Sequence, residues 1–396
     1  MTAGRPAPIP GPLRTNAAWP WSGWACRDDA APLAVGSMFT GCGGLDLGAA
    51  TALGGAQLAW GADPDPHVRA VLAERLPGVP NLGDVTGIDW RAVPPVNVIT
   101  AGWPCQDISA AGRRAGLVHG ERSGLWRHIP QAVAVLRPAM VVLENVAALR
   151  WRGGGLGIVL DDLAGVGYDC LWTTMRASDV GAAHRRERVF LLAVPAPTAG
   201  AAAARLCQPG AASQAGPPRC WPRSGMSCHG GVRSLALPLA RAAAGGPVPL
   251  LPTPQARDYN RAQLPEVRRA GGHQVNLSDV VRGLAENWQA DGWGRYAPAI
   301  RRWEQILGRP APFPADPTRC GSFRLAVNFA QWCQGLPEDW VRGVPCLPYY
   351  AAIRILGNAV VPRQAAAALR GLVGIAATHV PPVPARAAAR GDDRAA

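Results

Sequence analysis

Short hydrophobic runs alternate with segments of helical period between residues 33 and 194. Each run is bounded by glycine, proline or polar residues, so we predict β-strands at 33–40, 57–62, 96–100, 139–143, 168–176 and 189–194. The intervening segments predict helices at 68–76, 123–136 and 156–164. Alternation of strands and helices indicates an α/β fold with a mostly parallel sheet.

The alternation stops on both sides of this region. Residues 1–31 and 195–250 are rich in alanine, glycine and proline and lack a sustained period. Structure should resume near Leu251, and an Ala-rich helix should begin near Pro362. The chain is thus divided into a disordered N-terminal extension at 1–31, an α/β domain at 32–194, a second domain at 195–324 with a low-complexity insert at 195–250, a return to the first domain at 325–374 and a disordered tail at 375–396.

A glycine-rich turn follows the first predicted strand, at residues 41–48. Such a turn lets backbone N–H groups approach a ligand closely, although glycines also mark ordinary turns. The second strand ends at Asp63, twenty residues after Gly43, the spacing expected of a carboxylate that binds ribose hydroxyls. Together these features predict a nucleoside at the switch point of the sheet.

Two further strands are followed by groups with catalytic chemistry. Cys105 comes directly after Pro104 and just past the strand at 96–100, and open α/β sheets bind ligands at this end of a strand. A lone cysteine is more often a small buried apolar residue, so a nucleophilic thiol needs support from the rest of the chain. Glu144 follows the strand at 139–143, where a carboxylate is costly unless it has a partner or a function.

Arginines lead into the last predicted strand of this domain. A run such as Arg-Arg-Glu-Arg at 185–188 is typical of a solvated charge cluster. It continues directly into the apolar strand, however, and alternate side chains of a strand point the same way. We therefore expect Arg186 and Arg188 to share a face.

The chain resembles the cytosine-C5 DNA methyltransferases, of prokaryotic or phage type, over residues 33–194 and 325–372. The resemblance rests on Phe-Thr-Gly-Cys-Gly-Gly-Leu at 39–45, Gly-Trp-Pro-Cys-Gln at 102–106, Glu-Asn-Val at 144–146, Arg-Glu-Arg at 186–188 and Gly-Asn at 357–358, in the family's order. One position departs, because His184 stands where the family usually has glutamine. The resemblance implies a Rossmann-like, S-adenosylmethionine-dependent methyltransferase domain with a smaller, irregular target-recognition domain.

The same resemblance implies the roles of single residues. Asp63 would bind the ribose of S-adenosylmethionine, and Asp84 its adenine amino group. Cys105 would attack C6 of a flipped-out cytosine, Glu144 would hold a proton on N3, and Arg188 would hold O2. The full catalytic set is Cys105, Glu144, Arg186 and Arg188. The full cofactor-binding set is Phe39, Gly41, Gly43, Gly44, Leu45, Asp63, Asp84, Pro104 and Asn358.

The charge of the chain favours a polyanionic partner. Forty basic residues oppose 27 acidic ones, for a net charge of +13, and every basic residue is arginine. A GC-rich coding bias explains arginine in place of lysine but not the excess of base. Between residues 251 and 323, arginines alternate with tryptophans, which suits nucleic acid and equally suits a small core. The predicted DNA-binding residues are Gln106, Ser109, Arg113, Arg257, Arg261, Arg268 and Arg269.

Other function classes find little support. The ten cysteines fit no zinc spacing, so we predict no metal site and free thiols in a reducing cytosol. No apolar run reaches the length of a membrane span. We therefore predict a cytoplasmic, monomeric enzyme that acts on double-stranded DNA, with a separately acting cognate restriction endonuclease as a conceivable partner.

Two alternatives stay open beside a DNA methyltransferase. A relative that methylates transfer RNA should lack a large basic recognition domain, whereas this chain has many arginines between 251 and 320. A catalytically inactive DNA-binding homologue should have lost Cys105 or Glu144, and both residues are present.

Overall fold

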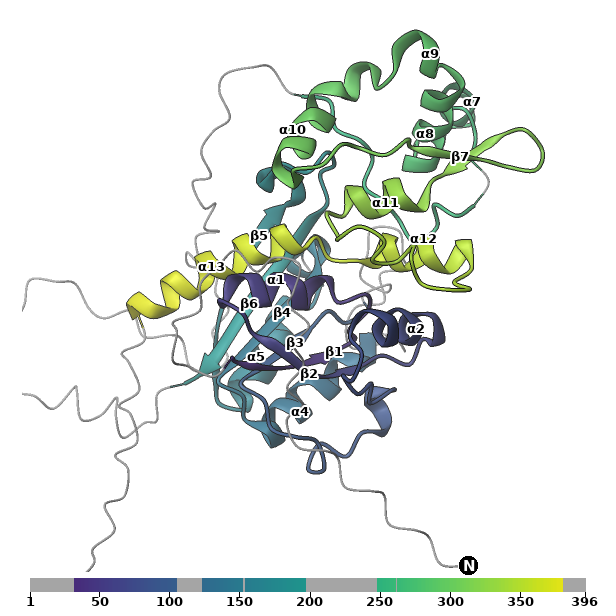
Figure 1. Cartoon of the computed structure of the whole chain (residues 1–396). Helices are drawn as coiled ribbons and strands as arrows, with labels where there is room; N and C mark the ends of the chain where they lie inside the picture. The colour runs from purple at the N-terminus through teal and green to yellow at the C-terminus, as the bar shows by residue number, and fades with distance from the viewer. Residues whose placement is uncertain (1–31, 105–122, 152–153, 197–247, 261, 380–396) are drawn as a thin grey trace, which may run out of the picture.

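A six-stranded sheet forms the centre of the first domain (Figure 1). The computed structural model describes residues 32–104, 123–151, 154–196, 248–260 and 262–379. The strand order is β2-β1-β3-β4-β6-β5, with parallel pairing from β2 to β4 and with β6 antiparallel to both of its neighbours. The strands are β1 (Ala34–Met38), β2 (Gln57–Ala62), β3 (Val98–Ala101), β4 (Met140–Val146), β5 (Tyr168–Arg176) and β6 (Glu187–Pro195).

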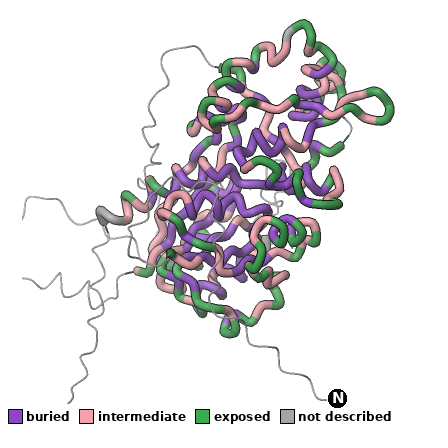
Figure 2. The backbone as a smooth tube through the Cα atoms, viewed as in Figure 1, coloured by how far each residue is buried: buried purple, intermediate pink, exposed green. Residues whose placement is uncertain are grey.

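Helices cover both faces of this sheet. On β4, Val142 packs into the cluster that includes Leu369, whereas its neighbour Leu143 packs into the cluster that includes Ile129, because successive strand residues point to opposite faces. Figure 2 shows the resulting buried layers between helices and sheet. One face carries α1 (Gly44–Ala52) and α13 (Pro362–His379), and the other carries α4 (His128–Leu136) and α5 (Leu156–Gly165).

The ends of the helices follow local capping chemistry. The helix predicted at 68–76 is α2 (Pro66–Arg75), and it begins earlier because the Asp65 side chain accepts hydrogen bonds from two of its first N–H groups. The segment predicted as one helix at 123–136 opens as a 3-10 turn over Ser123–Arg127 and continues as α4.

The described part of the predicted second domain is mainly helical, and its aromatic side chains form a core together with α11. Trp303 is wholly buried, and the Trp293 ring stacks on Phe329 with centroids 5.3 Å apart. The tryptophans between the arginines therefore fill a core, which decides between the two interpretations of the sequence. The elements are α7 (Pro265–Ala270), α8 (Leu277–Glu286), α9 (Trp288–Asp291), a 3-10 turn (Gly294–Tyr296), α10 (Ala297–Leu307), β7 (Ala315–Pro317) and β8 (Phe323–Leu325).

The chain then returns to the first domain through α11 (Val327–Cys333), α12 (Tyr349–Asn358) and α13. The helix predicted near Pro362 is α13, and it runs to His379, past the boundary set at 374. The predicted segments 1–31, most of 195–250 and 380–396 lie outside the described residues. Within the described part of the chain, no helix combines the length and the apolar character needed to cross a membrane.

Candidate active site

The glycine-rich turn between β1 and α1 is held in the left-handed backbone region. Phe39, Gly41 and Gly43 have φ values of 55°, 53° and 78°. A Cβ added at Gly41 would meet no atom within 4 Å, so the turn faces open space on that side. A Cβ at Gly44 would lie 2.3 Å from the Val360 carbonyl oxygen, so only glycine permits the approach of the return segment. This open, backbone-lined turn fits a nucleoside ligand.

Asp63 lies beside this turn at the end of β2. One carboxylate oxygen accepts the N–H of Gly41 at 3.0 Å, and the other accepts the N–H of Asp65 at 3.0 Å. Burial raises the pKa of the carboxyl above its usual value, opposed by these two hydrogen bonds. The twenty-residue spacing from Gly43 thus brings a carboxylate to the glycine turn, and ribose binding by Asp63 stays a prediction.

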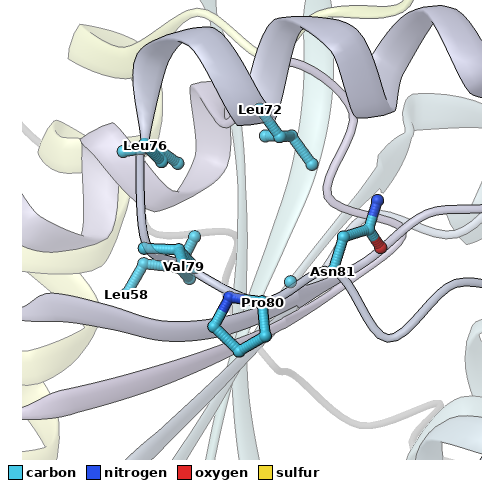
Figure 3. Close-up of a pocket in the computed structure, with 7 residues that line it drawn as sticks. Leu58, Leu72, Leu76, Val79, Pro80 and Asn81 are labelled. Carbon is cyan, nitrogen blue, oxygen red and sulfur yellow. The ribbon is translucent and has the colours of Figure 1, made fainter. Parts of the chain in front are cut away.

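Asn81 fixes the backbone of Asp63. Its side chain accepts the Asp63 N–H at 3.0 Å and donates to the Asp63 carbonyl at 3.1 Å. Figure 3 shows Asn81 at the edge of a hollow between α2 and β2, with a volume of about 10 Å³. That volume holds at most one water molecule, so this hollow is too small for a nucleoside.

The remaining predicted cofactor-binding residues differ in how far they are exposed. Asp84 is exposed and caps a 3-10 turn, and its bond from the Thr86 N–H at 2.9 Å lowers the pKa of its carboxyl. Leu45 is buried in the core between α1 and the sheet, so only its backbone is left for a ligand. Pro104 is half-buried after β3, and Asn358 is exposed in the last turn of α12.

Two residues without a predicted role hold the glycine turn. The Trp340 indole donates to the Cys42 carbonyl at 2.7 Å, while the Trp340 carbonyl accepts from Arg75 at 2.8 Å. Asp46 is buried in the first turn of α1 and accepts from the Ser37 hydroxyl at 3.0 Å and from the Thr100 hydroxyl. Burial raises the pKa of Asp46 to about 6. The sequence signal for Asp46 is an acidic residue inside an otherwise apolar and glycine-rich segment.

Glu144 lies at the carboxyl end of β4 with 8% of its surface exposed. Its Oε1 atom is 3.0 Å from Nε of Arg188, and a Cβ added at Gly102 would lie 3.4 Å from its Oε2 atom. Burial raises the pKa of Glu144, and the charge of Arg188 opposes that rise. The carboxyl therefore faces the segment that leads to Cys105, with a cation fixed beside it.

Asn145, the next residue on β4, holds the same segment. Its side-chain amide donates to the Trp103 carbonyl at 3.1 Å, and its oxygen accepts the Val146 N–H at 2.7 Å. Asn145 has no predicted role of its own. The predicted nucleophile Cys105 lies outside the described residues, as do Gln106, Ser109 and Arg113.

Arg186 differs from Arg188 in what it contacts. Arg186 is not on the predicted strand, because β6 begins at Glu187 and Arg186 has a φ of 26°, but its charge acts on Glu144 together with that of Arg188. Its Nη1 atom donates to the Gly357 carbonyl at 3.0 Å and the Pro254 carbonyl at 3.3 Å. Burial lowers the pKa of its guanidinium. Arg186 therefore joins the first domain to the start of the second and to α12.

His184 also connects the two domains. Its Nε2 atom lies 2.9 Å from the Cys333 carbonyl oxygen, and the ring is fully buried. Burial lowers the pKa of His184 to about 3, so the ring is neutral. The position where the family usually has glutamine thus carries a neutral hydrogen-bonding group that faces α11, while the His184 backbone pairs with Leu251 at the start of the second domain.

The arginines predicted to read DNA fall into two groups. Arg257 and Arg269 are exposed, with Nε of Arg257 bonded to the Gln255 side chain at 2.8 Å. Arg268 is partly buried and lies 3.5 Å from the fully buried carboxylate of Asp279 on α8. Arg261 lies outside the described residues. Within the described part of the chain, no three histidine, cysteine or acidic side chains form a group that could hold a metal ion.

Comparison with known proteins gives partial matches. Residues 33–201 match the family described as C-5 cytosine-specific DNA methylase. The chain is 35% identical over 165 residues to Type II methyltransferase M2.BsuMI of Bacillus subtilis (strain 168), covering 40% of this chain and 41% of that protein. It is 40% identical over 99 residues to Type II methyltransferase M.CviJI of Paramecium bursaria Chlorella virus IL3A, covering 25% of this chain and 26% of that protein.

The matched part therefore spans less than half the length of these two relatives. Among solved structures, the S. pombe Dnmt2 methyltransferase is similar with a TM-score of 0.51, over 87% of this chain and 99% of that chain. The sequence identity is 14%, so this likeness shows the fold alone.

Proposed function

Because residues 33–201 match the C-5 cytosine-specific DNA methylase family, we propose that the chain transfers a methyl group from S-adenosylmethionine to C5 of cytosine in duplex DNA. The observation that supports this most directly is the buried pair of Glu144 and Arg188 at the carboxyl end of β4. The Glu144 carboxyl of this pair lies next to Gly102, and Gly102 precedes Cys105 by three residues. A buried carboxyl and cation at one sheet edge, with a thiol three residues along the chain from Gly102, suit addition to a pyrimidine ring.

The cofactor would bind at the glycine turn. The N–H groups of the turn and the Asp63 carboxylate would hold the nucleoside, and Trp340 and Asp46 would keep the turn in place. When bound, S-adenosylmethionine supplies the methyl group from its sulfonium. Asp84 and Asn358 are exposed and accessible to the adenine and to the rest of the ligand.

The reaction would begin with the thiolate of Cys105, which adds to C6 of the cytosine. Glu144 would hold a proton on N3, so the ring electrons move to C5, which then takes the methyl group. Burial favours the protonated form of Glu144 that this step needs. Loss of the C5 proton would then expel the sulfur, and Arg188 would hold O2 throughout. The base must be flipped out of the duplex because these atoms are inaccessible in the stack.

The partner would be double-stranded DNA, bound by a cytoplasmic monomer, with a restriction endonuclease as a separate activity. Arg257, Arg261, Arg268 and Arg269 are our candidates for reading the bases around the target, and Gln106, Ser109 and Arg113 for contacts near the flipped cytosine. Arg186 would be a positioning residue, because its guanidinium is bonded to two carbonyls.

The test is methyl transfer from labelled S-adenosylmethionine to duplex DNA by the native protein and by Cys105→Ala. We expect no transfer by the variant and nearly unchanged cofactor binding, since the glycine turn and Asp63, not the thiol, would hold the cofactor. DNA that contains 5-fluorocytosine should form a covalent adduct with the native protein only, because the fluorine cannot leave as a proton does. Transfer by the variant at a hundredth of the native rate would contradict the role of Cys105.

A further inference from the structure

Glu187, the first residue of β6, gathers three arginines from three different segments. Its carboxylate lies 2.8 Å from Arg150, 3.5 Å from Arg176 and 3.0 Å from Arg185. The arginine side chains are 35%, 50% and 61% exposed, whereas that of Glu187 is 18% exposed. These four residues, which we call the Glu187 cluster, therefore carry an excess of two positive charges on an accessible surface.

The Glu187 cluster lies at the same sheet edge as the candidate active site. Arg176 pairs with Glu187 across β5 and β6, and the next residue, Arg188, pairs with Val146 across β6 and β4. Arg188 in turn contacts Glu144. Arg150 follows β4 by four residues, at the end of the 3-10 turn Ala147–Arg150. Because Glu187 and Arg188 are consecutive on β6, their side chains point to opposite faces of the sheet, so the cluster lies beside the strand end that carries the candidate base-holding cation rather than next to its guanidinium.

We propose that the Glu187 cluster binds backbone phosphates of the DNA strand that carries the flipped cytosine. The proposal rests on the proposed function and adds a surface to it, outside the second domain. A flipped nucleotide keeps its phosphates, which must then lie close to the pocket that holds its base. Guanidinium groups bind phosphate oxygens through paired N–H donors, and such contacts set the register of a protein on DNA.

Glu187 has a defined part in this surface. Three guanidinium groups repel one another, and the shared carboxylate offsets that repulsion and holds them in one place. Partial burial acts to raise the pKa of Glu187, but the three arginines outweigh it and hold that pKa below its usual value, so the carboxylate stays charged. Trp151, which follows Arg150, is 51% exposed and adds an aromatic side chain beside the cations.

The alternative is an ion network that only fastens the ends of β4, β5 and β6 and binds nothing. The two roles differ in their dependence on salt. The plot of log K against log salt concentration has a negative slope. Its magnitude should fall by about 0.9 for each phosphate that the protein ceases to neutralise. A purely structural network would change thermal stability and leave that slope as it is.

The experiment measures dissociation constants of duplex DNA by fluorescence anisotropy at several salt concentrations. The double variant Arg176→Gln with Arg185→Gln should reduce the slope by about 1.8 and weaken binding to all sequences alike. Arg185→Lys keeps the charge and should keep most of the slope. The control is Arg91→Gln, an exposed arginine in the segment that leads into the amino end of β3, which should leave the slope unchanged.

A slope for the double variant equal to the native slope, in a protein whose native form methylates DNA, overturns this inference and leaves the proposed function standing. A native protein that neither binds nor methylates duplex DNA overturns both. A reduced slope for an RNA duplex with an unchanged slope for DNA overturns the assignment to DNA. If Arg91→Gln and the double variant reduced the slope equally, the effect would follow from the net charge of the protein, and the proposed phosphate site at the Glu187 cluster would be wrong.

Discussion

The candidate active site at the sheet edge and the second domain hold their charged groups in opposite ways. At the edge, Glu144 and Arg188 are mostly buried and 3.0 Å apart, and Asp46 is buried with two hydroxyl donors. In the second domain, Arg257 and Arg269 are exposed, and the acid paired with Arg269 is 3.9 Å away. Buried polar groups are fixed because leaving one unpaired is costly, whereas exposed arginines can adapt.

The difference matches two kinds of task. Chemistry on a flipped cytosine is the same at every target and needs one fixed geometry. Reading the neighbouring bases needs donors that can enter a groove, and these must be exposed in the free protein. Substitutions of the buried groups in the candidate active site should therefore act on rate or on folding, whereas substitutions in the second domain should act on the choice of target.

The largest effect should come from Glu144→Gln. The amide cannot hold a proton on N3 in the same way, and it leaves Arg188 without its buried anion, so we expect kcat to fall by about 100-fold to 10,000-fold. Single-turnover methyl transfer measures this directly. Glu74→Gln, an exposed glutamate on α2, is the matched control and should keep the native rate. A fall of less than tenfold in Glu144→Gln would remove the distinction between the edge and the surface.

Asp46→Asn should change how stability depends on pH. Burial raises the pKa of Asp46 from 3.8 to about 6, so the folded protein holds this proton more tightly than the unfolded chain. Protonated Asp46 therefore adds to the free energy of unfolding, fully so below the unfolded pKa. This stabilisation, roughly 3 kcal/mol, is lost as pH rises through about 6, and Asp46→Asn should show no such loss. Urea unfolding of both proteins between about pH 4 and pH 7 gives the difference.

Thr100→Val sharpens the same prediction. The Thr100 hydroxyl is a donor to the Asp46 carboxylate, and removing it should raise the pKa further and move the loss of stability to higher pH. Identical pH profiles of stability for the native protein and Asp46→Asn would show that the pKa of this carboxyl is the same in the folded and unfolded states.

A smaller effect should separate Arg257 and Arg269 from Arg268. A base-reading arginine costs about 1 to 3 kcal/mol when removed and relaxes one position of the target site. Arg257→Gln and Arg269→Gln should each alter the site in this way if they read bases, whereas Arg268→Gln should mainly destabilise the packing of α7 on Asp279. Bisulfite sequencing of DNA from a methylation-free host gives the site. An unchanged site for both exposed arginines would move the reading surface elsewhere.

The smallest effect should follow excision of residues 197–247 with a short Gly-Ser bridge. The segment lacks core-forming periodicity, so we expect the methylated sequence and the rate to be kept. The same bisulfite assay measures both. A changed target site after excision would place recognition elements inside the insert.

The sequence by itself determined the strands and helices and the polar residues that lie near their ends. Strands at 57–62 and 168–176 have the predicted bounds, because period and bounding residues are local properties of the chain. The buried strand before Glu144 exists as predicted, but it runs on to Val146, so Glu144 is a strand residue paired with Phe190 rather than the residue that follows the strand. The predicted start of β6 is two residues late, because Glu187 and Arg188 are polar and join the sheet only by pairing with β5 and β4.

Only the tertiary structure decided which distant residues meet. Trp340 donates to a carbonyl nearly three hundred residues earlier, and Arg186 contacts carbonyls of two segments that follow it by 68 and 171 residues. No local pattern encodes such contacts, because they depend on how α12 and the second domain pack against the sheet. The sequence suggested that Arg186 and Arg188 act together, and the charges of both do act on Glu144. Only packing shows that Arg188 forms the ion pair with Glu144, whereas Arg186 donates to carbonyls of two distant segments.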